Sequence, residues 1–528
     1  LATRFMTDEH GAERYGFFDK LRSRYAGYLE SVYRIRWPLV IGYIIVCGGL
    51  VAVLLPWVGS EIFPTVQTNQ IQLRLRAPTG TRVEKTELIA LRAMDVIKQT
   101  VGPDNVEITT GFIGVATPNY PINPIYLFTN GQHEAVLKLA LKSSAPHTGS
   151  ALEEELRGKL KEALPDTSVS FEPADIIGQV MSFGSPTPIE VAVQSPNLAI
   201  SRPFAETVRV QLAKLPFLRD LQYAQPLDYP TIDVAIDRDR AGQFGLSMAD
   251  VARSLVPATS SSRNTDLNFW RDPRSGNAFQ IQVEVPQNKI TSLEDMQGMP
   301  VMRTDGVNGS ASRPLLADVA SVRYGTTMGE VDRYNMQRVI SFTANVYGMP
   351  LGEAITKIRQ AVAAAGEAPR GVNVFLRGQV PAFEETLSGL RTGLVFAVVV
   401  IFLLLAANYE SLRLSLAVIS TVPAVVLGVI VMLLLTGTTL NVQSFMGAIM
   451  AIGISVANAI LLVTYAEDAR RGGMSVQAAV KDGAVGRLRP ILMTALAMMA
   501  GMVPLALAYG EGSQAAPLGR AVIGGLLA

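Results

Sequence analysis

Two polar residues with helical spacing lie inside a long apolar stretch of the sequence. Ser455 and Asn458 are three residues apart, which places their side chains on one face of a helix. Uncharged polar groups in hydrocarbon need hydrogen-bond partners, so we expect both to face the interior of a helix bundle. Two interpretations are open. The pair lines a path for protons, or it holds neighbouring helices together at about 0.5 to 2 kcal/mol per residue.

A second group of candidate residues is apolar and aromatic. Segment 111–128 combines glycine and proline with large apolar side chains, a composition that suits a cleft for bulky amphiphiles. Its candidate pocket residues are Phe112, Ile113, Tyr120, Ile122, Tyr126 and Phe128. The alternative is a loop whose aromatic side chains only pack on a sheet. Prolines at 118, 121 and 124 predict a stiff loop.

Residues for redox, zinc or nucleotide chemistry are missing from the sequence. Cys47 is the single cysteine, and His10, His133 and His147 are scattered. No Gly-x-x-x-x-Gly-Lys-Ser/Thr run is present to bind phosphates, so we expect no cofactor, no direct use of ATP and no enzyme. The net charge of +1 indicates no nucleic-acid partner. The methionines of the long polar segment have no three-ligand spacing, which favours core packing over metal binding.

The candidate residues must be positioned by membrane helices. Hydrophobic residues make up 49% of the chain and charged residues only 17%, which is typical of a membrane protein. Stretches without Asp, Glu, Lys or Arg predict five spans, since about 20 residues cross a bilayer as a helix. They are 38–57, 392–409, the two halves of 414–466, which separate at a turn over 436–441, and 490–510, with the start of a sixth at 521–528.

Lys and Arg near the span ends predict the orientation. Segment 1–36 and the loop before 490 are rich in Lys and Arg, whereas the turn at 436–441 has neither. The leading segment is therefore expected in the cytoplasm and 59–386 outside it, which is the periplasm of a Gram-negative cell. An apolar stripe over 18–32 predicts a helix lying in the cytoplasmic membrane interface, or a juxtamembrane helix packed on protein.

The long polar segment shows repeated strand, helix, strand patterns. Such units pair into split βαβ sandwiches, in which helices cover one face of a sheet. The four predicted units cover 70–110, 135–171, 189–223 and 339–376. Between the third and fourth units, 230–331 has short strands and turn-rich breaks, so we expect an inserted subdomain there.

Three segments resemble the resistance-nodulation-division (RND) transporters, in the acriflavine-resistance-like branch of multidrug efflux permeases. They are Ala407-Asn-Tyr-Glu-Ser411, the run 453–463, and Arg487-Leu-Arg-Pro-Ile-Leu-Met-Thr494. The resemblance covers essentially the whole chain and implies the C-terminal half of such a permease. Because the chain starts at Leu1 and stops inside an apolar run, we also expect it to be a segment of a longer polypeptide.

The resemblance implies a fold made of a membrane α-helical bundle and an α+β periplasmic domain. That domain would consist of split βαβ (ferredoxin-like) porter subdomains with an inserted docking subdomain. The expected divisions are a cytoplasmic interfacial helix segment at 1–36, a transmembrane helix at 37–58, porter subdomains at 59–229, a docking-like subdomain at 230–331, the second part of the porter at 332–386, and four full spans with a truncated fifth at 387–528.

The function implied by the resemblance is proton-driven export of drugs or amphiphiles from the periplasm or outer leaflet. The exporter would be a homotrimer in the inner membrane, contacting lipid and working with a periplasmic adaptor and an outer-membrane channel. Thr494 would join Ser455 and Asn458 in the proton path, and segment 111–128 would be the switch loop beside the drug pocket. Alternatives are heavy-metal cation export and a non-transporting membrane receptor or assembly protein.

One position departs from the family pattern. Ala457 stands where the best-known drug pumps of this family have a lysine that pairs with carboxylates in the other half of the protein. Alanine has no charge to exchange between partners. Proton coupling therefore rests on the resemblance alone, because an ionisable residue inside the membrane would be the usual marker of such a path.

Overall fold

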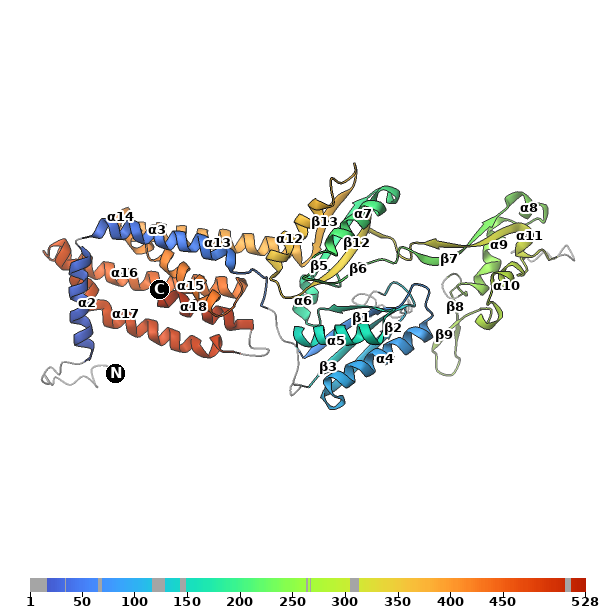
Figure 1. Ribbon diagram of the computed structural model, residues 1–528, viewed down its shortest axis with the longest axis horizontal. Coiled ribbons are helices and arrows are strands. Elements are labelled where there is room, and N and C mark those ends of the chain that lie inside the picture. Colours follow the sequence, from blue (N-terminus) through green and yellow to red (C-terminus); the bar gives the residue numbers. More distant parts are fainter. Residues whose placement is uncertain are drawn as a thin grey trace.

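The computed structural model describes residues 17–33, 35–64, 69–115, 129–142, 149–262, 265, 267–303, 313–508 and 514–528. The molecule is elongated (Figure 1), with a helical bundle at one end, two β-sheets in the middle and a smaller lobe at the far end. This arrangement agrees with the predicted combination of an apolar helical bundle and an α+β domain.

Within the described residues, five helices are long and apolar enough to cross a membrane. They correspond to the five predicted spans. They are α3 (Arg36–Leu54) with the turn η1 (Leu55–Trp57), α13 (Gln379–Tyr409), α14 (Leu412–Ile419) continued by α15 (Val422–Leu435), α16 (Val442–Arg471) and α17 (Val476–Ala506). A shorter helix, α18 (Ala516–Leu527), lies where the sixth span was expected, and α2 (Phe17–Tyr33) packs against α17.

Two helices extend further than their charge-free stretches. Helix α17 begins at Val476, because the Ser475 hydroxyl caps it by accepting a hydrogen bond from the Ala478 N–H. The arginines of the Arg-Leu-Arg-Pro motif are therefore helical and do not belong to the preceding loop. Helix α13 begins at Gln379, so the expected division at residue 386 falls inside a continuous helix. In both cases the helix continues through polar residues that a hydropathy criterion excludes.

The first sheet has the antiparallel strand order β2-β3-β1-β4. This is the strand order of a split βαβ unit, with two helices on one face. The sheet is made of β1 (Gln70–Arg76), β2 (Val106–Ile113), β3 (Glu134–Leu141) and β4 (Ser168–Glu172), and the helices are α4 (Val83–Val101) and α5 (Ser150–Ala163), with the turn η2 (Pro103–Asn105) before β2. Leucines and isoleucines of the strands and helices form its buried core.

The second sheet repeats this order as β13-β5-β12-β6, with the short strand β11 beside β12. Its elements are β5 (Ile189–Ser195), β6 (Leu218–Tyr223), β11 (Asp332–Tyr334), β12 (Gln337–Val346), β13 (Asn373–Gly378), α7 (Leu198–Leu212) and α12 (Leu351–Ala364). A short helix, α6 (Ile176–Met181), connects the two sheets. The two helices and the sheet enclose the largest apolar core among the residues that the structure describes.

The far lobe is inserted between β6 and β12, where the sequence predicts an inserted subdomain. It is attached by a two-stranded ribbon of β7 and β10 and has a small core of its own. Its elements are β7 (Tyr229–Ile236), α8 (Arg238–Gln243), α9 (Met248–Leu255), η3 (Val256–Ala258), β8 (Asn268–Arg271), β9 (Ala278–Ile281), η4 (Gln287–Lys289), α10 (Leu293–Gln297), α11 (Leu316–Val319) and β10 (Ala320–Thr327).

The second sheet and the bundle share one continuous segment. Strand β13 ends at Gly378, and α13 starts at the next residue. Gly378 has φ +75, and a Cβ atom there would lie 2.5 Å from the Pro188 carbonyl oxygen, so only glycine fits this turn. Val380 and Phe383, in the first turns of α13, are buried in the core of the second sheet. One helix therefore belongs both to that core and to the membrane bundle.

A second junction follows the first span. Residue Ser60 pairs with Leu440 in the turn between α15 and α16, and its carbonyl accepts a hydrogen bond from the Gly352 N–H at 3.0 Å. The Glu61 carboxylate accepts a hydrogen bond from Thr439 Oγ1 at 3.0 Å. The segment after α3 thus contacts both the bundle and the start of α12.

Glycines let α18 approach its neighbours closely. A Cβ atom on Gly428 of α15 would lie 2.3 Å from the carbonyl oxygen of Gly524 in α18, and one on Gly447 of α16 would lie 2.6 Å from the Leu518 carbonyl oxygen. Such small-residue contacts are common where membrane helices pack. The α18 helix is therefore held by backbone-to-backbone packing against α15 and α16.

Candidate functional site

Strand β1 has one apolar and one polar face. Leu73 and Leu75 point into the core under α4 and α5, while Gln72, Arg74 and Arg76 alternate with them on the opposite face. Gln72 and Arg74 are nevertheless buried. A buried arginine needs carboxylate partners, so this face must carry acidic residues from the neighbouring strands.

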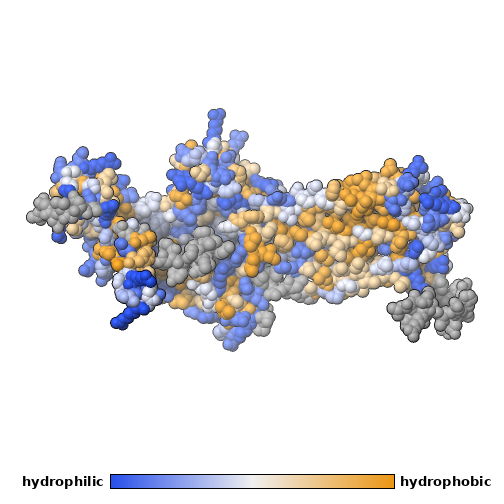
Figure 2. All heavy atoms as spheres, turned by 180° about the vertical axis from the view of Figure 1, so that it is seen from behind, coloured by the Kyte–Doolittle hydropathy of each residue, from blue (hydrophilic) through white to orange (hydrophobic). Residues whose placement is uncertain are grey.

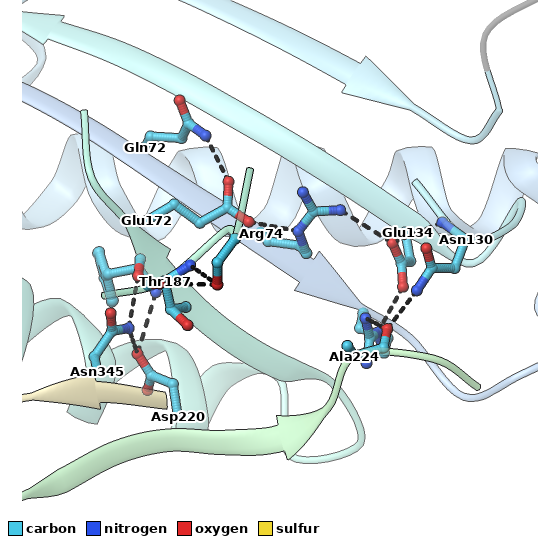
Figure 3. A network of polar contacts seen from close by, with 12 residues as sticks. Gln72, Arg74, Asn130, Glu134, Glu172, Thr187, Asp220, Ala224 and Asn345 are labelled. Atoms are coloured by element: carbon cyan, nitrogen blue, oxygen red, sulfur yellow. Dashed lines mark hydrogen bonds and ion pairs between the residues drawn. The ribbon is translucent and has the colours of Figure 1, made fainter. Parts of the chain in front are cut away.

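Those partners come from the strands on either side of β1 (Figure 3). Arg74 Nε lies 2.5 Å from Glu172 Oε1 on β4, and its Nη1 lies 3.2 Å from Glu134 Oε2 on β3. Arg76 Nε reaches the other oxygen of Glu134 at 2.6 Å. Gln72 donates a further hydrogen bond to Glu172. Three adjacent strands thus hold one connected charge network.

The second sheet turns its own polar face toward this network. On that side Arg377 Nη1 lies 3.0 Å from Glu190 Oε1, and the guanidinium stacks 4.8 Å from the Tyr334 ring centre. Between the two faces lies a cavity of about 330 Å³. Its charged lining residues are Arg74, Arg76, Arg333, Arg377, Glu172, Glu190, Glu330 and Asp332. The cleft therefore offers both signs of charge to whatever enters it.

Direct bonds join the two sheets at both ends of the cleft. At one end Arg76 Nη2 donates to the Ala224 carbonyl at 3.0 Å, and Asn130 donates to the same oxygen. At the other end Asn345 Nδ2 donates to the Phe171 carbonyl of the first sheet at 2.6 Å, and it also donates to Asp220 Oδ2 of its own sheet at 2.8 Å (Figure 3). These bonds fix the distance between the sheets, and the cavity lies between them.

The charge network shifts the pKa of several groups. Burial alone would lower the pKa of Arg74, but the Glu172 and Glu134 carboxylates outweigh it and raise this pKa. Burial raises the pKa of Glu330, and the nearby Asp332 raises it further. These shifts favour a charged Arg74 and disfavour the charged form of Glu330.

A buried histidine lies beside the network. Neither ring nitrogen of His133 has a hydrogen-bond partner among the described residues, and burial lowers the pKa of its imidazole. A lowered pKa favours the neutral imidazole at neutral pH. The charge on Glu134 is consequently balanced by Arg74 and Arg76 rather than by His133.

The structure places two of the candidate pocket residues, Phe112 and Ile113, on opposite faces of one strand. Phe112 and Ile113 both lie in β2, which continues past residue 110 because 111–113 pair with residues 135–137 of β3. Ile113 points into the core under the helices. Phe112 pairs with Val136, which pairs with Arg74, so Phe112 is on the face that carries the ion pairs. The strand, rather than a loop, positions both residues.

The rest of segment 111–128 has four candidate residues, Tyr120, Ile122, Tyr126 and Phe128, which lie outside the described residues. The described ends of the segment are close together, since Thr129 Oγ1 donates to the Gly114 carbonyl at 2.7 Å. The next residue, Asn130, donates its N–H to Glu134 Oε2 at 3.0 Å. The described residues that follow the segment, Thr129 and Asn130, therefore lie beside the charge network.

In the bundle, two of the three polar candidates meet. Thr494 Oγ1 of α17 lies 3.3 Å from Asn458 Oδ1 of α16. Ser455 lies one turn before Asn458 and takes no part in this contact. Ala457, beside Asn458, is exposed in this chain. Ser455 and Asn458 are partly buried and Thr494 is exposed, so the contact links two neighbouring helices at the surface of the described bundle rather than in its interior.

A double-mutant cycle tests this contact. Asn458→Leu and Thr494→Val should each cost about 0.6 kcal/mol of bundle stability, the average for such bonds between membrane helices. Since both changes remove the same bond, the double variant should lose little more than either single variant. Thermal unfolding in detergent of the unmodified protein, the two single variants and the double variant measures these losses of stability. Fully additive losses would mean that the two side chains do not share a bond.

The comparison with protein families decides what kind of chain this is. Residues 7–528 match the sequence profile of the AcrB/AcrD/AcrF family. The chain belongs to the AcrB/AcrD/AcrF family. The predicted membership of the RND efflux permeases is thereby confirmed.

Relatives of this AcrB/AcrD/AcrF-family chain differ in what their names say they export. The cation efflux system protein CzcA of Alcaligenes sp. (strain CT14) is 25% identical over 488 residues, which is 92% of this chain and 44% of CzcA. The antibiotic efflux pump membrane transporter ArpB of Pseudomonas putida is 26% identical over 538 residues, 98% of this chain and 48% of ArpB. The two sequence identities are too similar to indicate which class of substrate this chain's relatives share with it.

A solved structure has the same fold. The crystal structure of a heavy metal efflux pump superposes with a TM-score of 0.80 at 24% identity, over 96% of this chain and 51% of that pump. The AcrB/AcrD/AcrF-family chain spans about half the length of the curated relatives it matches, which fits the prediction that it represents the C-terminal half of a permease.

The charge network was not among the residues singled out from the sequence. Its signal was present in β1, where polar and charged residues alternate with leucines in the run Gln-Ile-Gln-Leu-Arg-Leu-Arg. Such alternation predicts a strand with one polar face. It does not show that the polar face is buried, because that depends on the second sheet. The partners Glu134 and Glu172 come from distant strands.

Proposed function

We propose that this chain is the C-terminal half of an inner-membrane transporter that exports small amphiphilic compounds from the periplasm or the outer leaflet. The charged cleft between the two sheets is the observation that carries this proposal. Its paired arginines and carboxylates suit the polar or zwitterionic part of a substrate. Phe112 and the aromatic segment that begins beside it suit the apolar part.

The α13 helix supports coupling between the membrane and the cleft. It starts in the core of the second sheet, next to the strand that carries Arg377, and crosses the bundle as one helix. A movement of α13 in the membrane would thus change the position of that sheet relative to the first. We propose that the proton-motive force drives this movement, with Ser455, Asn458 and Thr494 on the proton path.

The assembly that we propose follows the family resemblance. The transporter acts as a homotrimer in the inner membrane, with the two sheets and the far lobe in the periplasm. The porter function belongs to the two sheets and the docking function to the far lobe, which contacts a periplasmic adaptor and an outer-membrane channel.

Heavy-metal cation export is a second candidate, because the cleft contains carboxylates and CzcA is named for cation efflux. Two of these carboxylates, Glu172 and Glu190, already pair with arginines. Among the described residues there is also no cluster of three His, Cys, Asp or Glu side chains that could hold a metal ion. These observations favour the amphiphile.

Phe112→Ala in the complete transporter tests the proposal. We expect substrates that contact this ring to lose about 1 to 3 kcal/mol of binding, because a large apolar contact is removed. Minimal inhibitory concentrations for several unrelated drugs and for zinc, cobalt and nickel salts, normalised to the amount of transporter in the membrane, measure this. The loss should fall on bulky aromatic drugs and leave the metal salts unchanged.

The neighbouring Ile113→Ala is the matched control. It removes a similar apolar side chain from the opposite face of β2, where it packs in the core. We expect it to lower the amount of protein and to affect all compounds equally. If Phe112→Ala behaves in the same way as Ile113→Ala, Phe112 has no role in substrate binding. A change in metal resistance alone would favour the cation exporter.

A further inference from the structure

The short helix α6 carries an apolar face that no other described segment covers. Ile176, Val180 and Phe183 are 79%, 66% and 70% exposed. Ile176 and Val180 are four residues apart, which places them on one side of the helix, and Phe183 follows two residues after the helix ends. Residues 176–189 contain no Asp, Glu, Lys or Arg, and the charged residue nearest to this face in the sequence is Asp175, which caps the helix. An exposed apolar face of this kind marks a contact surface.

The opposite side of α6 shows where this surface lies in the molecule. Ile177 and Met181 line a cavity of about 250 Å³ together with residues 61–64, which leave the first span, and with Gln514, which precedes α18. Helix α6 is therefore at the end of the α+β domain that faces the bundle (Figure 1). In Figure 2 the apolar surface of the bundle continues onto the adjoining end of that domain.

The membrane boundary is close to this position. Trp57 ends the first span and is 78% exposed, and exposed tryptophans at span ends are typical of the membrane interface. Glu61 follows four residues later and lines the cavity under α6. The short connection between Trp57 and this cavity places α6 close to the end of the first span.

The backbone around α6 is fixed. The Asp175 side chain caps the helix by accepting the Gly178 N–H at 2.6 Å. Gln379, the first residue of α13, donates its Nε2 hydrogen to Ser182 Oγ at 3.3 Å. Phe183 has φ +48, a conformation that a bulky residue keeps only where its surroundings impose it. The apolar face is consequently held in one orientation and tied to a membrane-spanning helix.

We propose that α6 is a membrane-contact element, whose Ile176, Val180 and Phe183 side chains lie among the phospholipids of the outer leaflet at the boundary of headgroups and acyl chains. Apolar side chains at that depth leave water, while the helix stays in the membrane plane. The continuity with the apolar bundle surface favours lipid over a protein partner. This proposal does not depend on which compounds the transporter exports.

Fluorescence quenching in vesicles tests the proposal. In the full chain with Cys47→Ser, single cysteines at Val180, Leu88 and Val53 are labelled with an environment-sensitive fluorophore. Each protein is reconstituted into phosphatidylethanolamine and phosphatidylglycerol vesicles that contain lipids with a nitroxide near the glycerol backbone. Leu88 on α4 is the matched control, since it is 66% exposed like Val180, and Val53 in the first span is the lipid reference.

We expect the nitroxide lipids to quench the Val180 label about as strongly as the Val53 label and several times more strongly than the Leu88 label. Iodide in the water phase should quench only the Leu88 label. Equal iodide quenching at Val180 and Leu88 would mean that α6 faces water. Protection of Val180 from both quenchers would mean that protein covers the helix. Either result overturns the proposal, provided that the labelled proteins unfold at the temperature of the parent.

Discussion

Replacing Arg74 with alanine is expected to destabilise the α+β domain by about 3 to 5 kcal/mol, the usual cost of leaving a buried charge without its partner. Glu134 would keep Arg76, but among the described residues Glu172 would keep only the Gln72 amide. Thermal unfolding of the detergent-solubilised protein should therefore show a large decrease in the transition assigned to this domain.

The control for Arg74→Ala is a solvent-exposed ion pair. Lys159 and Glu155 form an exposed pair on α5, and Lys159→Ala should change stability by at most about 0.5 kcal/mol. A double variant, Arg74→Met with Glu172→Leu, should recover much of the loss, because it removes both charges together. If Arg74→Ala is as mild as Lys159→Ala, the network does not stabilise the sheets.

Gly428→Leu should be the most damaging single change in the bundle. The new side chain would meet the backbone of α18 at Gly524, which cannot move aside as a flexible side chain can. Overpacking of this kind costs typically about 1 to 3 kcal/mol and more where the obstacle is backbone. We expect a lower unfolding temperature and a smaller amount of protein in the membrane.

Gly453→Leu provides the comparison within the same bundle. Gly453 lies in α16, and a Cβ atom there would have no neighbour within 4 Å. The two variants add the same side chain to a membrane helix, so they differ mainly in what surrounds it. Equal behaviour of the two variants would show that α18 is not held by the close approach at Gly428.

Much of the fold follows from local sequence patterns. Apolar length predicts the spans, and the change from helical to alternating periodicity predicts the strands of both sheets within a few residues. The helix ends are less well predicted, as in α17, because a cap such as Ser475 rather than hydropathy decides where a helix begins. The end of β2 was missed because Phe112 and Ile113 pair with β3, which is a contact between distant residues.

The candidate sites also divide into features that local sequence predicts and features that depend on contacts between distant residues. The contact between Asn458 and Thr494 agrees with the family motif that suggested Thr494, whereas the spacing of Ser455 and Asn458 did not lead to a contact that includes Ser455. The charge network depends on the register of three strands, which the sequence alone does not specify. The apolar face of α6 was not singled out, since its short apolar run reads as ordinary core. Only its position beside the membrane helices distinguishes it.

The continuity of strand β13 and helix α13 has a consequence for rotation as well as for distance. Each residue of an α-helix turns the chain by about 100° and advances it by about 1.5 Å. The 31 residues of α13 therefore set the angular phase between the second sheet and every downstream face of that span. One residue inserted between Arg391 and Thr392 would turn the membrane face by more than a quarter of a circle while changing its depth only slightly. The number of residues in this connection is therefore constrained, because each insertion or deletion rotates the membrane face of the helix. A flexible linker of the same length would not impose this constraint.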